Sequence, residues 1–146
     1  MAWPLLLLMA ALVALPGCGS DELESPTAKK LQALGNFYLD YAVGKNGKGP
    51  ENEQELKKHI RSTPDHVLST TGFDRNSIDS LFNSERDQQP FVVLYGLTIK
   101  QVGGKSAPLV AHEKTGKNGK RLVGFANGKV ELVEESRLNE LLPAKQ

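Results

Sequence analysis

The hydrophobic pattern of this sequence changes character once, near Pro90. Before that point apolar side chains recur at three- and four-residue steps, as Leu31, Leu34 and Tyr38 do, and this spacing places them on one face of an α-helix. After it, short β-branched and aromatic runs alternate with Asn-Gly signals, which favours antiparallel strands joined by tight turns. Because the two patterns are segregated along the chain, we predict an α+β fold. It comprises a long N-terminal helix packed on a small antiparallel sheet of three to four strands, and a short C-terminal helix.

The first half of the chain is predicted to be helical with intervening turns. Ser25 is a favourable N-cap and Pro26 suits the first helical position, while Gly44 marks the end of the long helix. The next helix has acidic residues in its first turn and basic residues in its last, as the helix dipole favours. The predicted helices and brief turns cover residues 26–43, 51–61, 64–68 and 77–82.

The second half is predicted to be a series of strands and hairpins. The segment TGKNGK, residues 115–120, suits a hairpin turn, and Asn127-Gly128 suits a tight turn of type I′. Residues 97–102 either extend the first strand or form a second one. The other predicted strands and the closing helix cover residues 91–95, 108–112, 121–125, 129–133 and 134–142.

The N-terminal segment has the pattern of a lipoprotein leader. An apolar run over residues 5–15 is followed by Gly17 and Cys18. It is shorter than the roughly 20 residues of a membrane-spanning helix, and it matches the ~7–15 apolar residues of a signal peptide. We therefore predict a lipoprotein signal peptide, a lipidated cysteine with a short acidic tether, and a single α+β domain, over residues 1–17, 18–25 and 26–146.

Cys18 is the only cysteine in the sequence. A single thiol cannot form an internal disulfide, and an unpaired one in an exported protein calls for another explanation. Lipidation of Cys18 by palmitate-type acyl chains supplies it. The alternative is an ordinary secretory leader with an incidental cysteine beside the cleavage site.

The composition argues against several classes of partner. The chain has 18 basic and 17 acidic residues, a formal net charge of +1, so no electrostatic argument supports nucleic-acid binding. Aromatic residues make up only 6% of the chain. With no disulfide available, we expect a core built from aliphatic packing.

Three segments carry a resemblance to known proteins. NGKGP at residues 46–50, after the predicted long helix, resembles the start of the globular part of type II secretion pseudopilins and type IV pilin-like proteins. DQQPF at residues 87–91 is similar to a shortened form of their loop before a strand. LVGFANGKVE at residues 122–131 resembles the hairpin of bacterial prepilin-processing-associated domains.

The resemblance implies a pilin-head-like fold over most of residues 31–142. In pilin-class proteins a long apolar helix stays in the mature chain and builds the filament, whereas here the predicted apolar segment is removed. Asn127 and Lys129 stand where the related hairpin has aspartate and histidine, so no metal role is predicted for that turn. We therefore use the resemblance to predict the fold rather than a role in a filament.

No metal site is predicted. The histidines lack the close spacing of zinc ligands; they are His59, His66 and His112. A second group of side chains offers oxygen ligands in the irregular middle: Asp74, Asp79, Glu85 and Asp87. Some secretion pseudopilins bind calcium in loops, but this spacing is not that of an EF-hand. A solvated loop face is the preferred interpretation, and a calcium site is the alternative.

No catalytic or cofactor-binding residue is predicted either. The sequence has no Gly-x-Ser-x-Gly elbow for a serine nucleophile. Residues 103–106, GGKS, end like a phosphate-binding loop, but Ile99 occupies the position of its first glycine. We therefore expect a protein that is not an enzyme.

One basic cluster is a candidate for surface contacts. It consists of Lys114, Lys117, Lys120 and Arg121 around the predicted 115–120 turn. These residues either contact lipid phosphates or an acidic partner, or are simply solvated.

The leading hypothesis from the sequence is a non-enzymatic, lipid-anchored cell-envelope protein that faces the periplasm or the cell exterior. Its expected partners are the membrane, through the lipid, and another envelope protein; no nucleic acid or small-molecule substrate is expected. The alternative is an accessory or pseudopilin-like component of a type II secretion or pilus-like apparatus.

Overall fold

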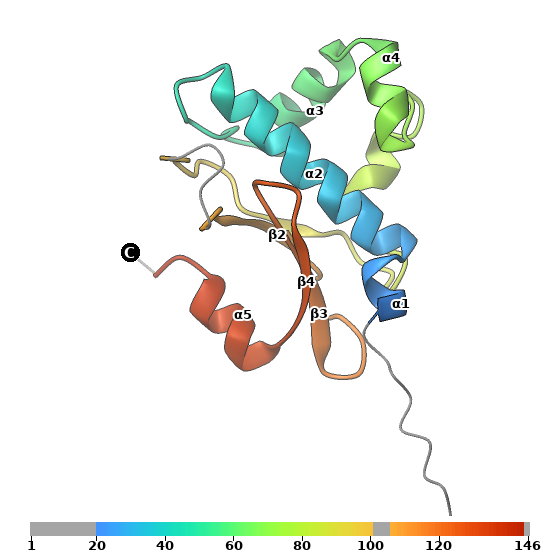
Figure 1. Ribbon diagram of the computed structural model, residues 1–146, viewed down its shortest axis with the longest axis vertical. Helices are drawn as coiled ribbons and strands as arrows, with labels where there is room; N and C mark the ends of the chain where they lie inside the picture. The colour runs from blue at the N-terminus through green and yellow to red at the C-terminus, as the bar shows by residue number, and fades with distance from the viewer. Residues whose placement is uncertain (1–19, 101–105, 145–146) are drawn as a thin grey trace, which may run out of the picture.

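The computed structural model describes residues 20–100 and 106–144, and it combines helices with one antiparallel sheet (Figure 1). The predicted leader and Cys18 lie outside the described residues. The four strands follow the order β1-β2-β3-β4, so each pairs with its neighbour in sequence. The predicted α+β class and the strand number are confirmed. The strands are β1 Val92–Val93, β2 Leu109–His112, β3 Lys120–Phe125 and β4 Val130–Glu134.

The long predicted helix is α2, Pro26–Val43. The Ser25 side chain accepts a hydrogen bond from the Ala28 N–H at 3.2 Å, which satisfies one of the free donors of the first turn. Gly44 forms the C-cap, as predicted. The apolar stripe that begins with Leu31 is buried on the sheet.

The remaining helical segments are short and lie near their predicted positions. The second helix begins two residues later than predicted, because the Asn52 side chain accepts the Glu55 N–H at 2.9 Å and caps it there. The segments are α3 Glu53–Ser62, α4 Asp65–Leu68, η1 Ser69–Thr71, η2 Asp79–Phe82 and α5 Glu135–Leu141.

The predicted strand over residues 97–102 does not join the sheet within the described residues. The chain turns away at Gly96, whose φ is +71°. The next residues pair with the loop after α2 instead: the Gly49 N–H donates to the Leu97 carbonyl at 2.8 Å, and the Ile99 N–H donates to the Gly47 carbonyl at 2.7 Å. β1 therefore ends after two residues. Residues 101 and 102 lie outside the described residues.

The two hairpin turns differ in type. In the β2–β3 turn, Asn118 and Gly119 both have positive φ, at 54° and 73°, as a type I′ turn requires. At the β3–β4 turn only Gly128 has positive φ, and its N–H donates to the Phe125 carbonyl at 2.9 Å. The type I′ turn predicted at Asn127-Gly128 is therefore wrong. The chain forms a turn closed by a left-handed glycine, the arrangement of a three-residue hairpin loop.

The sheet separates two unequal hydrophobic clusters. Successive residues of β3 point to opposite faces, so Leu122 belongs to the large cluster under α2 and Val123 to the smaller cluster under α5. Figure 1 shows α2 crossing one face of the sheet and α5 lying against the other. The larger cluster also includes side chains of α3 and η2, and both of these elements contact α2.

Part of the predicted tether is structured. Ser20–Leu23 form α1, a single helical turn next to the start of α2 (Figure 1). Glu22 in this turn is only 23% exposed at its side chain because it pairs with Arg86. The acidic segment therefore docks on the domain and does not act as a free spacer from Ser20 onward.

Two glycines, Gly35 and Gly124, allow α2 to approach the β3–β4 hairpin at backbone distance. A Cβ at Gly35 would overlap the Phe125 carbonyl oxygen and lie 3.2 Å from the Gly128 nitrogen. At Gly124, a Cβ would lie 3.1 Å from the Leu31 carbonyl oxygen. At these two positions the helix and the hairpin therefore meet backbone to backbone.

We expect Gly35→Ala to destabilise the protein by about 1–3 kcal/mol, the usual cost of overpacking, although alanine is the better helix former. The matched control is Gly44→Ala, because Gly44 has an ordinary φ of −71° and the nearest atom to a new Cβ is 3.6 Å away. That control should be neutral or stabilising by about 0.4–1 kcal/mol. Urea unfolding of both variants measures the difference, and equal stability would contradict the close approach.

Candidate functional site

A buried carboxylate lies where β2 ends. Glu113 follows β2 directly and its side chain is 0% exposed. Its oxygens accept hydrogen bonds from the Ser84 hydroxyl and the Leu122 N–H, each at 2.9 Å, and from the Arg86 guanidinium at 2.5 Å. A buried carboxylate is tolerated when it is paired and its lone pairs are satisfied, and both conditions hold here.

The Glu113 side chain also replaces part of the β2–β3 ladder. The Glu113 N–H donates to the Leu122 carbonyl at 3.0 Å, as an antiparallel pair should. The return bond from the Leu122 N–H goes to the Glu113 carboxylate instead of its carbonyl. The freed carbonyl bonds His112 Nδ1 at 2.7 Å. Since a carbonyl only accepts, Nδ1 carries the proton in this contact.

Arg86 joins three segments that are distant in sequence. Its Nε donates to Glu22 of α1 at 2.7 Å and its Nη1 to Glu113. The guanidinium also donates to two carbonyls of the β2–β3 turn, those of Lys117 and Lys120, each at 3.2 Å. The side chain is only 7% exposed. Such multiple, directed bonding is what the planar guanidinium provides and a lysine ammonium does not.

Asp87 fixes the other side of the same turn. Its carboxylate accepts the N–H groups of Thr115 and Gly116, each at 2.9 Å. Partial burial raises the pKa of Asp87, but these hydrogen bonds outweigh it and leave the pKa below its ordinary value. Thr27 at the start of α2 accepts the N–H groups of Glu85 and Arg86 at 3.2 Å. The loop over residues 84–87 is therefore bonded to both α2 and the turn.

These contacts form one network of hydrogen bonds and ion pairs. The carboxylates of Glu113 and Asp87 both accept hydrogen bonds from other protein groups. The role of the network is to hold α1, the 84–87 loop and the β2–β3 turn together.

We expect Glu113→Gln to destabilise the protein by about 3 kcal/mol or more, because removing one partner of a buried ion pair leaves Arg86 insufficiently compensated. The control is Glu140→Gln, which breaks an exposed pair with Arg137 at 2.9 Å and should leave the free energy of unfolding nearly unchanged. Urea titration measures both. A Glu113→Gln protein as stable as the control would contradict the assigned role.

His112 is buried within the same region. Burial lowers the pKa of His112 and is the largest effect. The hydrogen bond to the Glu113 carbonyl raises that pKa, the nearby charge of Arg121 lowers it further, and the charge of Glu135 raises it slightly. The folded protein therefore favours the neutral imidazole.

A histidine whose pKa is lower in the folded than in the unfolded protein contributes its full stabilisation at pH values above the unfolded-state pKa. As the pH falls below that pKa, the unfolded chain binds the proton more readily and the stabilisation decreases. We expect the stability of the wild type to fall as pH drops below about 6.5, the ordinary histidine value. His112→Gln should flatten that part of the profile, while His66→Gln, at an exposed site, should keep it. Thermal unfolding between pH 7 and pH 5 makes the comparison, and an unchanged slope in His112→Gln would count against it.

The other predicted ligand candidates are not brought together. His59 bonds Asp40 at 2.8 Å and packs edge-on against Tyr41, and His66 is exposed on α4. Among residues 20–100 and 106–144, no group of three or more His, Cys, Asp or Glu side chains is placed to hold a metal ion.

The acidic side chains of the irregular middle each have a separate protein partner. Asp74 accepts the N–H groups of its own turn at Asn76 and Ser77. Asp79 pairs with Lys57 at 2.9 Å, and Glu85 pairs with Lys30 at 2.8 Å. The structure therefore does not support the alternative of a calcium site formed by these residues. The GGKS segment is described only from Ser106 onward.

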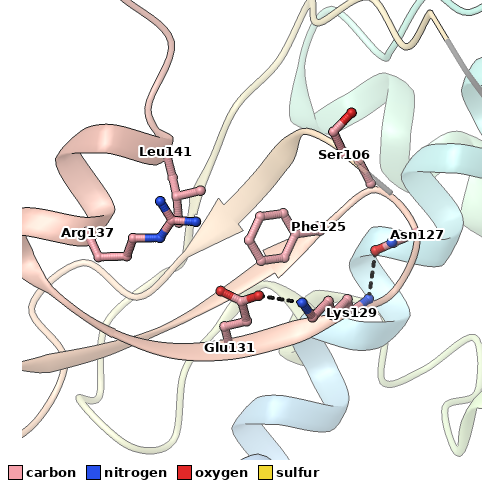
Figure 2. Close-up of a pocket in the computed structure, with 8 residues that line it drawn as sticks. Ser106, Phe125, Asn127, Lys129, Glu131, Arg137 and Leu141 are labelled. Carbon is pink, nitrogen blue, oxygen red and sulfur yellow. Dashed lines mark hydrogen bonds and ion pairs between the residues drawn. The ribbon is translucent and has the colours of Figure 1, made fainter. Parts of the chain in front are cut away.

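A small pocket opens on the α5 side of the sheet, with a volume of about 290 Å³. Figure 2 shows the Lys129–Glu131 ion pair on one side of the Phe125 ring and Arg137 of α5 on the other. Lys129 Nζ lies 2.6 Å from Glu131, and Arg137 bonds Glu140 at 2.9 Å. The pocket is at the lower limit of the ~300–1,000 Å³ typical of ligand sites. Its lining residues are Ser106, Ala107, Phe125, Asn127, Lys129, Glu131, Arg137 and Leu141.

The predicted basic cluster is divided by the structure. Arg121 pairs with Glu135 of α5 at 2.9 Å. Lys114, Lys117 and Lys120 are exposed around the β2–β3 turn, and we call these three residues the lysine turn. These three lysines of the predicted cluster stay together on one turn and remain exposed.

Comparison of the chain with protein-family models, with curated proteins and with solved structures gave no match. Within the part of the chain that the structure describes, no helix has the length and apolar character needed to cross a bilayer.

Proposed function

We propose that this protein is a lipid-anchored component of the cell envelope, attached through Cys18 and acting as a binding or structural module. The observation that carries the proposal is the leader. An apolar run over residues 5–15 is followed by Pro16, by the small residue Gly17 and then by Cys18, the only cysteine of the sequence. Cleavage before Cys18 would place the acylated residue two positions ahead of α1, where the domain begins.

The physical basis of attachment is the burial of acyl chains. Each buried CH₂ contributes about 0.8 kcal/mol, and two chains give stable anchoring where one does not. A diacylated Cys18 would therefore hold the domain at a membrane without any membrane-spanning helix.

A non-enzymatic role is supported by how the polar side chains are used. His59, Glu113 and Asp87, which have the chemistry of general bases, are bonded to Asp40, to Arg86 and to the β2–β3 turn. These bonds hold segments together and do not converge on a shared cavity. We therefore propose that the protein works through its surface.

Cys18→Ser is expected to move the protein from the membrane fraction to the soluble fraction of exported protein, because the acyl acceptor is lost. The control is Ser20→Ala, a change of a hydroxyl two residues away, which should stay in membranes. Immunoblotting of fractionated cells measures the ratio. Mass spectrometry of the wild type should find an acylated N-terminal cysteine, and an intact Met1 end or an unmodified thiol would overturn the proposal.

A second candidate is an accessory of a type II secretion or pilus-like apparatus. The sequence resemblance is joined by one structural observation: α2 packs on an antiparallel sheet and touches the β3–β4 hairpin at Gly35 and Phe125. The LVGFANGKVE resemblance falls on that hairpin. Genes for a secretion ATPase or prepilin peptidase beside this one, or co-purification with pilin-class subunits, would favour this candidate over a free-standing lipoprotein.

A further inference from the structure

The lysine turn has no charge partner in the structure. Lys114, Lys117 and Lys120 are exposed, and none of them forms an ion pair with any residue in 20–100 or 106–144. The backbone that carries them is fixed, because Arg86 bonds the carbonyls of Lys117 and Lys120. Three unpaired ammonium groups are thus presented on one rigid turn.

The same arginine fixes the turn to the start of the described chain. Arg86 Nε bonds Glu22 of α1 at 2.7 Å, so α1 and the lysine turn lie at one end of the molecule (Figure 1). Cys18 precedes Ser20 by two positions, and two residues span about 7 Å at most. Any anchor on Cys18 is therefore close to this end.

The opposite end of α2 lies far from this surface. Helix α2 has 18 residues, which corresponds to about 27 Å at 1.5 Å per residue. Lys45 follows the last turn of α2, and α3 is bonded there through His59 and Asp40. Exposed Lys45 and Lys58 of α3 therefore mark the far end and are matched controls for the lysine turn.

We propose that the lysine turn contacts the anionic phospholipid headgroups of the membrane that holds the lipid anchor, an inference that rests on the proposed lipidation of Cys18. Lysines near an anionic bilayer are attracted within about one Debye length, ~10 Å at 0.1 M salt. The anchor brings the turn into that range, and rigidity keeps it there.

Other groups at this end bear on the contact. Leu23 of α1 is 43% exposed and adds an apolar side chain to this end of the domain. The exposed carboxylates here are Asp21 and Glu24 near α1, Glu134, which is opposite Lys120 in the sheet, and Glu135 of α5, which pairs with Arg121. These carboxylates lie on or next to α1, on β4 and on α5, and the Asp87 carboxylate bonds the turn backbone at Thr115 and Gly116. The charged side chains of residues 114–120 themselves are all lysines.

Amine footprinting of the full-length protein tests the orientation. The protein, extracted from membranes in detergent, is reconstituted into vesicles of phosphatidylcholine alone or with phosphatidylglycerol, and co-flotation is checked. It is then acetylated and each lysine is quantified by mass spectrometry. Lys114, Lys117 and Lys120 should react several-fold more slowly in the anionic vesicles than in detergent, while Lys45 and Lys58 should not change.

The outcomes separate the two proposals. A protein that fails to float with the vesicles overturns both the anchoring and the orientation. A protein that floats while its lysine turn reacts as fast as in detergent overturns the orientation alone. Equal protection in pure phosphatidylcholine would overturn the headgroup-charge contact, since anionic lipid would then be unnecessary.

A charge variant keeps one lysine as the reporter. In a Lys114→Gln, Lys120→Gln double variant, the protection of Lys117 in anionic vesicles should fall several-fold toward its detergent value, because the attraction is weakened. A Lys45→Gln, Lys58→Gln double variant should leave Lys117 protection unchanged. Unchanged protection in the first variant would overturn the proposal.

Discussion

The guanidinium of Arg86 joins segments that no regular element connects. It bonds Glu22 of α1, Glu113 at the end of β2 and the carbonyls of the β2–β3 turn. An arginine has five N–H donors in a fixed plane. The guanidinium of Arg86 uses them in four contacts that point in different directions. Removing a charged group from water costs free energy, so a buried guanidinium is tolerated where hydrogen bonds and ion pairs compensate for the lost hydration. The consequence is that α1, the end of β2 and the β2–β3 turn are bonded to one another through a single side chain.

The network also explains an irregularity of the sheet. β2 and β3 should exchange two backbone hydrogen bonds at Glu113 and Leu122, but the carboxylate takes the place of one carbonyl. The substitution brings a negative charge to Arg86 and leaves a carbonyl for His112. The Glu113 side chain therefore ends the ladder and pairs with Arg86, while the Glu113 backbone carbonyl fixes the histidine tautomer. Because all three effects involve Glu113, a substitution of this residue changes all of them together.

Local signals predicted most of the fold. The Ser25-Pro26 start and the Gly44 end of α2 were visible because capping acts within a few residues, and the strands of the meander followed from β-branched runs and Asn-Gly turns. What failed depended on distant partners. The segment after Gly96 pairs with a loop about fifty residues away rather than with the sheet, and α1 is bonded to the domain through the distant pair of Glu22 with Arg86. Nothing in the local sequence distinguishes Glu113 from an ordinary charged turn residue, so the network could not be found from the pattern.

The lysine turn also combines a local signal that the sequence shows with a distant contact that only the fold shows. A run of lysines around a turn is visible in the sequence, but only the fold separates Arg121, which pairs with Glu135, from the three lysines that stay free. A rigid turn loses less conformational freedom on contact than a flexible one. Because Asp87 and Arg86 bond its backbone on both sides, the β2–β3 turn is already ordered. Orientation at a membrane would then follow from the domain itself, and the lipid would need to supply only proximity.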